Sequence, residues 1–217
     1  MPDYTPPPDY QGTPLRHVLP AGERLWLVHG QKRDATEFTV PRTDVHTPGG
    51  RFDGTYADPY GVCYAALDPS AALADVVFRS AGATRERVVR RAAVARMRAS
   101  VVVTVEDLPL VDLCNGPALA AVAQDGWLVT ADCGDYPLTR RWGSWIRSKA
   151  LWARGFIWAT GGSADHRSVV LFGDRCDSGV FLKDPYFALD LDDEIGTVWL
   201  NSQLVHVGAQ IEPPRKR

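Results

Sequence analysis

The chain has 217 residues, a size that fits one domain with a sizeable core. Its hydrophobic fraction of 45% is typical of globular proteins and excludes collagen-like and disordered classes. The formal net charge of −2 argues against general nucleic-acid binding. No apolar run approaches the roughly 18 residues that span a bilayer, and residues 1–20 do not resemble a signal peptide. We therefore expect a cytoplasmic protein without a membrane segment.

Proline is concentrated at the N-terminal end of the chain. Six prolines within residues 1–20 predict a disordered arm, because proline lacks a backbone N–H and restricts the chain. The segment 211–217 is predicted to be a frayed tail. No repeat or low-complexity linker divides the remainder, so residues 21–210 are predicted to form a single domain.

The first predicted elements are two strands and a helix. Arg24–His29 is a short apolar run typical of a strand, and residues 61–67 are nearly all apolar, as in a strand buried on both faces. Asp68 followed by Pro69 is typical of a helix start, with aspartate as the N-cap and proline at the first helical position. The spacing of apolar residues predicts a helix over residues 71–79.

The middle of the chain alternates between helical and extended patterns. Residues 84–99 have apolar residues at helical spacing with six arginines interleaved, which predicts a helix with a charged face. Residues 100–105 and 110–113 are predicted strands. The arginines could meet an acidic partner or nucleic acid, but a solvated helix face is the favoured explanation.

The C-terminal half contains the longest predicted helix and a hairpin. Residues 139–153 have tryptophans and small residues on one side, and Gly155 is a suitable residue to end the helix. Residues 155–160 and 168–172 are predicted strands joined by a glycine-rich loop. Because the helices do not alternate with the strands, the fold class is predicted to be α+β.

The segment that begins at Gly49 is the first candidate for chemistry. Gly49 and Gly50 let the backbone approach a ligand closely, and the Arg51 guanidinium provides a planar fork for phosphate oxygens. A surface arginine after a glycine turn is the alternative explanation.

Two further candidates follow within 24 residues. Tyr64 is a lone aromatic residue among small ones, where it could form a wall for a flat ring or simply be a core tyrosine. Asp75 has apolar neighbours, and its carboxylate is either placed for chemistry or paired with Arg79 four residues on.

The order arginine, tyrosine, acid resembles the RES domain family, which is named after arginine, glutamate and serine. The resemblance covers most of residues 24–207, and the order and spacing of its short motifs make it specific. The matching segments are residues 49–53, 60–66, 71–75, 110–113, 155–157 and 161–162.

Membership of this family would imply an ADP-ribosyltransferase-like fold and toxins of toxin–antitoxin pairs. Such toxins consume NAD as substrate by hydrolysis, phosphorolysis or transfer of ADP-ribose to a protein, without a metal. The implied partner is a helix-turn-helix antitoxin, through which any contact with nucleic acid would be indirect.

The resemblance also implies roles for individual residues. Arg51, on the Gly50 turn, would hold the NAD phosphates and assist catalysis, and Tyr64 would border the nicotinamide. Asp75 would take the place of the catalytic glutamate. The family serine falls at Thr139, at the predicted start of the tryptophan helix, where a helix N-terminus suits an anion. Thr139 could equally be only an N-cap.

Two departures from the family pattern bear on activity. Asp75 is one methylene shorter than glutamate, which withdraws the carboxylate by about 1.5 Å, and a misplacement of about 1 Å can cost roughly 100-fold in rate. Leu27 stands where many members have an arginine, and His29 or Arg33 could substitute for it. The alternatives are therefore an active enzyme, a catalytically degenerate module that binds nucleotide or a partner, and an unrelated α+β domain.

Three other features invite less specific interpretations. The acidic cluster at residues 190–194 could bind a cation but lacks the spacing of a calcium loop, so a solvated turn is favoured. His166 and Arg167 border the glycine-rich loop and could touch a ligand. The four cysteines form no CxxC pair and are expected to be core thiols rather than zinc ligands.

Overall fold

A computed structural model describes residues 5–10, 12–40, 49–74, 88–160, 163–205 and 209–213. The strands are β1 (Arg16–Leu19), β2 (Arg24–Gly30), β3 (Val62–Ala66), β4 (Val88–Val89), β5 (Met97–Val103), β6 (Leu108–Leu113), β7 (Gly155–Thr160), β8 (Ser163–Phe172), β9 (Phe187–Asp190) and β10 (Gln210–Ile211). The helices are α1 (Pro69–Leu73), α3 (Arg91–Val94), α4 (Gly116–Ala120), α5 (Trp127–Thr130), α6 (Tyr136–Lys149) and α7 (Glu194–Leu204), with short 3-10 helices at Cys133–Asp135 and Ser178–Val180.

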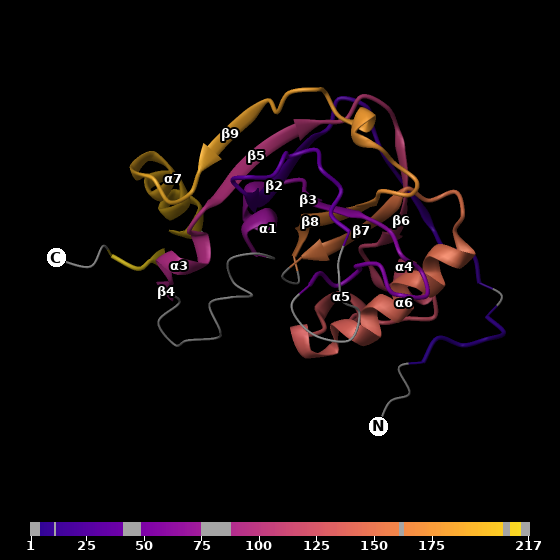
Figure 1. The fold of residues 1–217 in the computed structure, drawn as a ribbon. Helices are drawn as coiled ribbons and strands as arrows, with labels where there is room; N and C mark the ends of the chain where they lie inside the picture. Colours follow the sequence, from indigo (N-terminus) through magenta and orange to yellow (C-terminus); the bar gives the residue numbers. More distant parts are fainter. Residues whose placement is uncertain are drawn as a thin grey trace.

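Within the described residues, eight strands form one mixed sheet in the order β1-β6-β7-β8-β3-β2-β5-β9, and β10 pairs with β4. The pairs in this sheet are antiparallel except β6 with β7, which is parallel. A largely antiparallel sheet with helices grouped beside it agrees with the α+β prediction. Figure 1 shows α4, α5 and α6 together beside β6 and β7, and α7 with α3 at the other end of the sheet.

Helices cover one face of the sheet in two groups. The buried side chains of α4, α5 and α6 pack with Phe156, Trp158 and Val170 of the central strands. On the same face, α1 packs against Ala66 of β3, and α7 lies farther toward β9. The opposite face has its own apolar cluster, which includes Leu27. A region of β3 and β8 thus lies between the two groups of helices.

The predicted disordered arm is partly ordered in the structure. Residues 16–19 form β1, which pairs with β6 at one edge of the sheet. This correction has a simple physical reason, because no proline lies between Pro14 and Pro20 and the backbone can make a short ladder. The Tyr10 ring also packs against Trp145 of α6 in a tilted arrangement, with ring centroids 5.5 Å apart. At the other end, part of the predicted tail is likewise ordered, since β10 includes Ile211.

The predicted helix over residues 84–99 is wrong where the structure describes it. Residues 88–89 form β4, only residues 91–94 are helical, and β5 begins at Met97. Arg96 has a φ of 59°, which is a left-handed conformation that a continuing helix does not allow. Seven residues of β5 pair with β2 along its whole length, so the sheet overrides the local helical pattern.

The long helix is also displaced from its predicted bounds. It begins at Tyr136 rather than Thr139, and it ends at Lys149 rather than near residue 153. Gly155 is the first residue of β7 instead of a helix cap, and a side chain there would overlap the Val170 carbonyl of β8. Glycine is required at this position because the two strands approach closely.

The acidic cluster at residues 190–194 has structural partners. Asp190 forms an ion pair with Arg98 at 2.6 Å, and this contact lowers the pKa of the Asp190 carboxyl below its usual value. Asp193 caps α7 by accepting from the Gly196 N–H at 2.6 Å. These contacts agree with the interpretation as a solvated turn and helix start. Among the described residues, none of the helices has the length and apolarity needed to cross a bilayer.

Candidate functional site

The turn formed by Gly49–Asp53 is fixed on one side by α6. Thr139 donates its hydroxyl hydrogen to the Arg51 carbonyl at 2.7 Å. The neighbouring Arg140 donates its Nε–H to the Gly50 carbonyl at 3.0 Å. Two adjacent helical residues therefore hold two consecutive carbonyls of the turn.

Strand β3 fixes the same turn from the other side through Tyr64. The Tyr64 hydroxyl accepts from the Phe52 N–H at 2.8 Å and donates to Asp53 Oδ1 at 3.0 Å. Asp53 Oδ2 in turn accepts from the Gly50 N–H at 2.6 Å. Burial and the nearby Asp53 charge raise the pKa of Tyr64 well above its usual value, so the phenol remains a hydrogen-bond donor.

The two glycines are required by this close packing. A Cβ atom at Gly50 would overlap the Tyr64 hydroxyl and ring, and one at Gly49 would overlap the Arg140 guanidinium. The sequence predicted a close approach of the backbone to a ligand. In the structure, the backbone approaches the side chains that hold the turn.

Arg51 points from this turn toward α5 and α6. Its Nη1 donates to the Leu128 carbonyl at 3.2 Å, and its guanidinium carbon lies 5.0 Å from the centroid of the Tyr136 ring. The residue is 8% exposed. Among the residues that the structure describes, no other hydrogen bond to this guanidinium is found, so it retains N–H groups that could meet an anion.

Thr139 lies in the first turn of α6 and is fully buried. It is not the N-cap, because the helix begins three residues earlier at Tyr136, and its hydroxyl donates to Arg51 and contacts the Tyr136 carbonyl at 3.1 Å. The structure therefore gives Thr139 a role in positioning Arg51. Its expected contact with the ligand stays a prediction.

Asp75 lies outside the described residues, and so does Arg79. The structure does confirm the start of the helix that precedes it. Asp68 caps α1 by accepting from the Ala71 N–H at 2.9 Å, and Pro69 stands in the first turn. His166 lies in β8 rather than in the loop before it, and it contacts the same Asp68 carboxylate through Nδ1 at 3.1 Å, so it has a structural partner.

The register of β2 places Leu27 away from this site. Trp26 lies opposite Ala66, two residues after Tyr64, so these three side chains share one face of the sheet. Leu27 points to the opposite face and is 4% exposed in the other core. An arginine at position 27 would be buried there, and the absence of one says little about phosphate binding at the Tyr64 face.

His29 shares the Leu27 face and does not replace a phosphate ligand at the turn. Its Nδ1 donates to the Gly30 carbonyl at 3.1 Å, and its Nε2 faces the Ser100 hydroxyl at 2.9 Å. Burial lowers the pKa of His29 below its usual value, and the positive charges of Arg98 and Arg33 act in the same direction.

We expect this histidine to make stability fall on acidification. Since the folded-state pKa of His29 is below the unfolded value, the unfolded chain takes up the proton first as the pH falls below about 6.5. The stability contribution is present above that pH and is lost progressively as the pH falls from about 6.5 toward the lowered folded-state pKa of His29. Thermal unfolding followed across this range should show a smaller loss in the His29→Gln variant. Equal losses in both proteins would contradict the expectation.

Two hydroxyl groups that the sequence did not single out lie on the Tyr64 face. Thr160 Oγ1 and Ser168 Oγ are 2.6 Å apart and buried. Ser168 lies opposite both Trp158 and Ala66, in the part of the sheet between the two groups of helices. In the sequence, the alternation along β8 puts Ser168 on the same face as Val170. Which face of the sheet this is depends on the strand pairing, and the pairing in the structure makes it the face of Tyr64.

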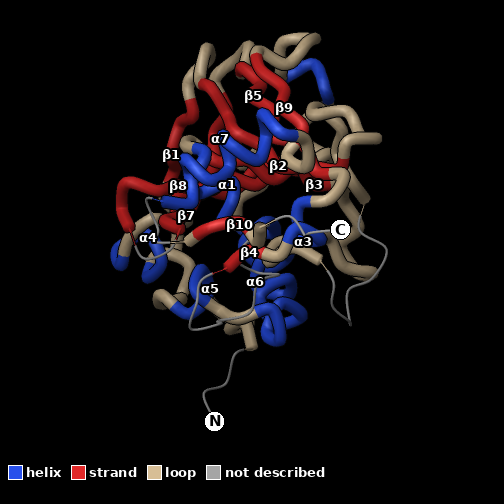
Figure 2. Tube along the Cα trace, turned by 90° about the vertical axis from the view of Figure 1, so that its left-hand side faces the viewer, coloured by secondary structure: helices blue, strands red, loops and turns tan. Residues whose placement is uncertain are grey.

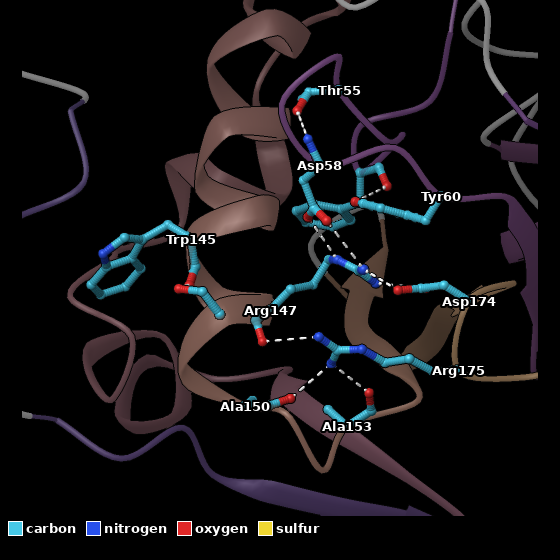
Figure 3. A network of polar contacts seen from close by, with 11 residues as sticks. Thr55, Asp58, Tyr60, Trp145, Arg147, Ala150, Ala153, Asp174 and Arg175 are labelled. Atoms are coloured by element: carbon cyan, nitrogen blue, oxygen red, sulfur yellow. Dashed lines mark hydrogen bonds and ion pairs between the residues drawn. The ribbon is translucent and has the colours of Figure 1, made fainter.

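A second polar network fixes the loop that leads from the turn to β3. Figure 3 shows Arg147 of α6 between Asp58 of this loop and Asp174, which follows β8. The guanidinium donates to Asp58 Oδ2 at 3.0 Å and to Asp174 Oδ2 at 2.7 Å. It also lies 3.6 Å from the centroid of the Tyr60 ring. Tyr60 in turn donates its hydroxyl hydrogen to the Phe52 carbonyl at 3.0 Å, which connects the network with the site.

The family model of the RES domain matches residues 24–192. This match includes the turn, Tyr64 and α6, and the chain therefore belongs to the RES domain family. A solved structure similar to this chain is the M. tuberculosis MbcT–MbcA toxin–antitoxin complex. The matched chain has 19% sequence identity and a TM-score of 0.56, with 80% of this chain and 86% of that chain covered. At this identity the likeness shows the fold alone. A comparison with curated proteins finds no match.

Proposed function

We propose that this RES domain is an NAD-consuming toxin with an ADP-ribosyltransferase-like fold, which cleaves the bond between nicotinamide and ribose. The observation that carries the proposal is the placement of Arg51. The Arg51 carbonyl accepts a hydrogen bond from Thr139 of α6, and the N–H of the next residue, Phe52, donates to Tyr64. Within the part of the chain that the structure describes, the Arg51 guanidinium donates only to the Leu128 carbonyl, so other N–H groups can meet a ligand. Membership of the RES family and the toxin–antitoxin origin of the structural neighbour support the proposal.

The proposed chemistry assigns a separate task to each residue. Arg51 binds the phosphates of NAD through its planar fork, and Tyr64 borders the nicotinamide. Cleavage of the bond leaves positive charge on the ribose, which the Asp75 carboxylate would stabilise. Nicotinamide leaves, and water, phosphate or a protein side chain accepts the ADP-ribose. Thr139 acts indirectly, by holding the Arg51 carbonyl.

Release of nicotinamide from NAD by the purified protein tests this proposal. We expect Arg51→Ala to lower the rate by about 100-fold or more, because an anion-binding group that fixes the substrate is lost. Arg51→Lys keeps the charge without the planar fork, so it should recover only part of the rate. Arg141→Ala is the matched control, since Arg141 is an exposed arginine on α6. Equal rates for the wild type and a folded Arg51→Ala would refute the assignment.

A second candidate is a module that binds NAD without turnover, or binds a partner. Aspartate at position 75 favours it, because a shorter side chain withdraws the carboxylate from the reacting atoms. Calorimetric titration with NAD, together with an assay for released nicotinamide, separates the two candidates. The binding module would bind NAD without releasing nicotinamide, whereas the enzyme would release it. Asp75→Glu should then create activity. The combined change with Leu27→Arg is unsuitable, because residue 27 is buried in the opposite core.

The proposed partner is an antitoxin of the helix-turn-helix type, in a bacterial cytoplasm. The support comes from the structural neighbour, which is a toxin bound to its antitoxin. Co-expression with the product of an adjacent gene tests this part of the proposal. Relief of growth inhibition together with a stable complex is the expected result, and inhibition that no adjacent gene relieves would contradict it.

A further inference from the structure

Helix α7 is apolar on two opposite sides. One side faces the core through Gly196, Leu200 and Leu204, all of which are buried. Gly196 lies so close to the Asp190 carbonyl that a side chain would overlap it. This packing fixes which side of α7 faces outward.

The outward side has a stripe of β-branched residues. Ile195, Val198 and Val205 are 71%, 67% and 66% exposed. Together with Ser202 they are spaced by three, four and three residues, which places all four on one face, opposite Leu200. Ser202 donates its hydroxyl hydrogen to the Trp199 carbonyl. Its side chain is therefore small and needs no hydrogen-bond acceptor from a partner. Figure 2 shows α7 at the front of the molecule, toward the viewer.

A helix with apolar residues on two opposite sides exposes one of these sides unless another chain covers it. We propose that a second copy of this chain covers the stripe, through antiparallel packing of two α7 helices around a two-fold axis. In such an interface each residue of the stripe meets the same patch of the other copy, and the small Ser202 near the axis allows a close approach.

The charges at the two ends of α7 match this antiparallel arrangement. Asp192, Asp193 and Glu194 are exposed at the N-terminal end. The C-terminal half lies beside Arg91, because Asn201 of α7 accepts from the Ile211 N–H and Arg91 donates to the carbonyl of the next residue, Glu212. Arg90, adjacent to Arg91, is exposed, and these two arginines outnumber the Glu212 carboxylate beside them, whose Oε2 accepts from the Arg91 N–H at 3.4 Å. Antiparallel packing brings the acidic end of one helix toward the basic end of the other, whereas parallel packing would bring like charges together.

The size of the interface sets the expected affinity. An 11-residue helix is about 16 Å long, so two such helices bury less than the roughly 1,200–2,000 Å² of stable interfaces. The flanking charges add contacts but are solvated. We therefore expect a reversible dimer with a dissociation constant in the micromolar range.

Sedimentation velocity of the full chain at low to high micromolar concentration tests this inference. The wild type should shift from monomer to dimer with increasing concentration. Val198→Glu should raise the dissociation constant at least about tenfold, because two carboxylates would be desolvated in one interface. Val198 is largely exposed, so the variant should keep the melting temperature of the wild type.

Leu151→Glu is the matched control, since Leu151 is 78% exposed and lies outside α7. It should dimerise like the wild type. Reversing one charge, in Glu194→Arg or Arg90→Glu, should weaken the dimer, and combining the two changes should restore it. A wild type that stays monomeric throughout overturns the inference and leaves the stripe to another protein. A dimer that Val198→Glu does not weaken overturns it as well.

Discussion

Replacing Arg140 by methionine is expected to lower the free energy of unfolding by about 3–5 kcal/mol. The Arg140 and Asp53 side chains are 0% and 5% exposed, and their charged atoms are 3.9 Å apart. Methionine fills much of the same volume but removes the buried positive charge beside the Asp53 carboxylate. The hydrogen bond to the Gly50 carbonyl is lost as well. Urea denaturation at neutral pH measures the difference.

Neighbouring and compensating substitutions identify the cause of this loss. Arg141→Met changes an exposed arginine one position along α6 and should alter the free energy of unfolding by less than about 0.5 kcal/mol. Asp53→Asn in the Arg140→Met background removes the carboxylate charge that Arg140 faced and should recover part of the loss. If Arg140→Met is as stable as Arg141→Met, the buried ion pair does not support the turn.

The sequence predicted that the Gly49–Asp53 turn and Tyr64 belong to one site, on the basis of family resemblance. The structure places them in one network, because the Tyr64 hydroxyl contacts Phe52 and Asp53. The role of Arg140 could not be predicted, since it is one of many arginines and contacts Gly50 90 residues away. A contact between such distant residues depends on the packing of α6, and local patterns do not contain it.

Sheet register limited the prediction in a similar way. The run Arg24–His29 predicted a strand, and β2 is found there. Which of its side chains face the site depends on the partner strand, and a shift of one residue exchanges the faces. Leu27 was therefore a plausible site position in the sequence, whereas pairing of Trp26 with Ala66 turns it into the opposite core.

Helical spacing was informative only where packing agreed with it. Trp142 and Ile146 are buried as their spacing in α6 predicted. Residues 97–99 had equally good helical spacing, yet they belong to β5, because pairing with both β2 and β9 outweighs local preference. Short elements such as α4 and α5 have too few residues to show a period, and the sequence did not predict them.

The site also depends on Arg147, which connects three segments that are far apart in sequence. Its side chain is 3% exposed and packs against the rings of Tyr60 and Phe172, at 3.6 Å and 4.3 Å from their centroids. Asp58 and Asp174, which receive its hydrogen bonds, are 34% and 42% exposed, so water partly screens the ion pairs. Most of its contribution therefore comes from packing, the cation–π contacts and the geometry of the loop.

We expect Arg147→Met to lower the free energy of unfolding by about 2–3 kcal/mol, less than Arg140→Met, because the two carboxylates left behind can be hydrated. Arg147→Lys should recover only part of this, since an ammonium cannot donate to Asp58 and Asp174 through a planar fork. Lys149→Met, an exposed change near the same end of α6, is the control. Denaturation of the three variants in low and high salt separates the contributions. A loss that disappears in high salt would mean that screened charge, rather than packing around Arg147, holds the loop against α6.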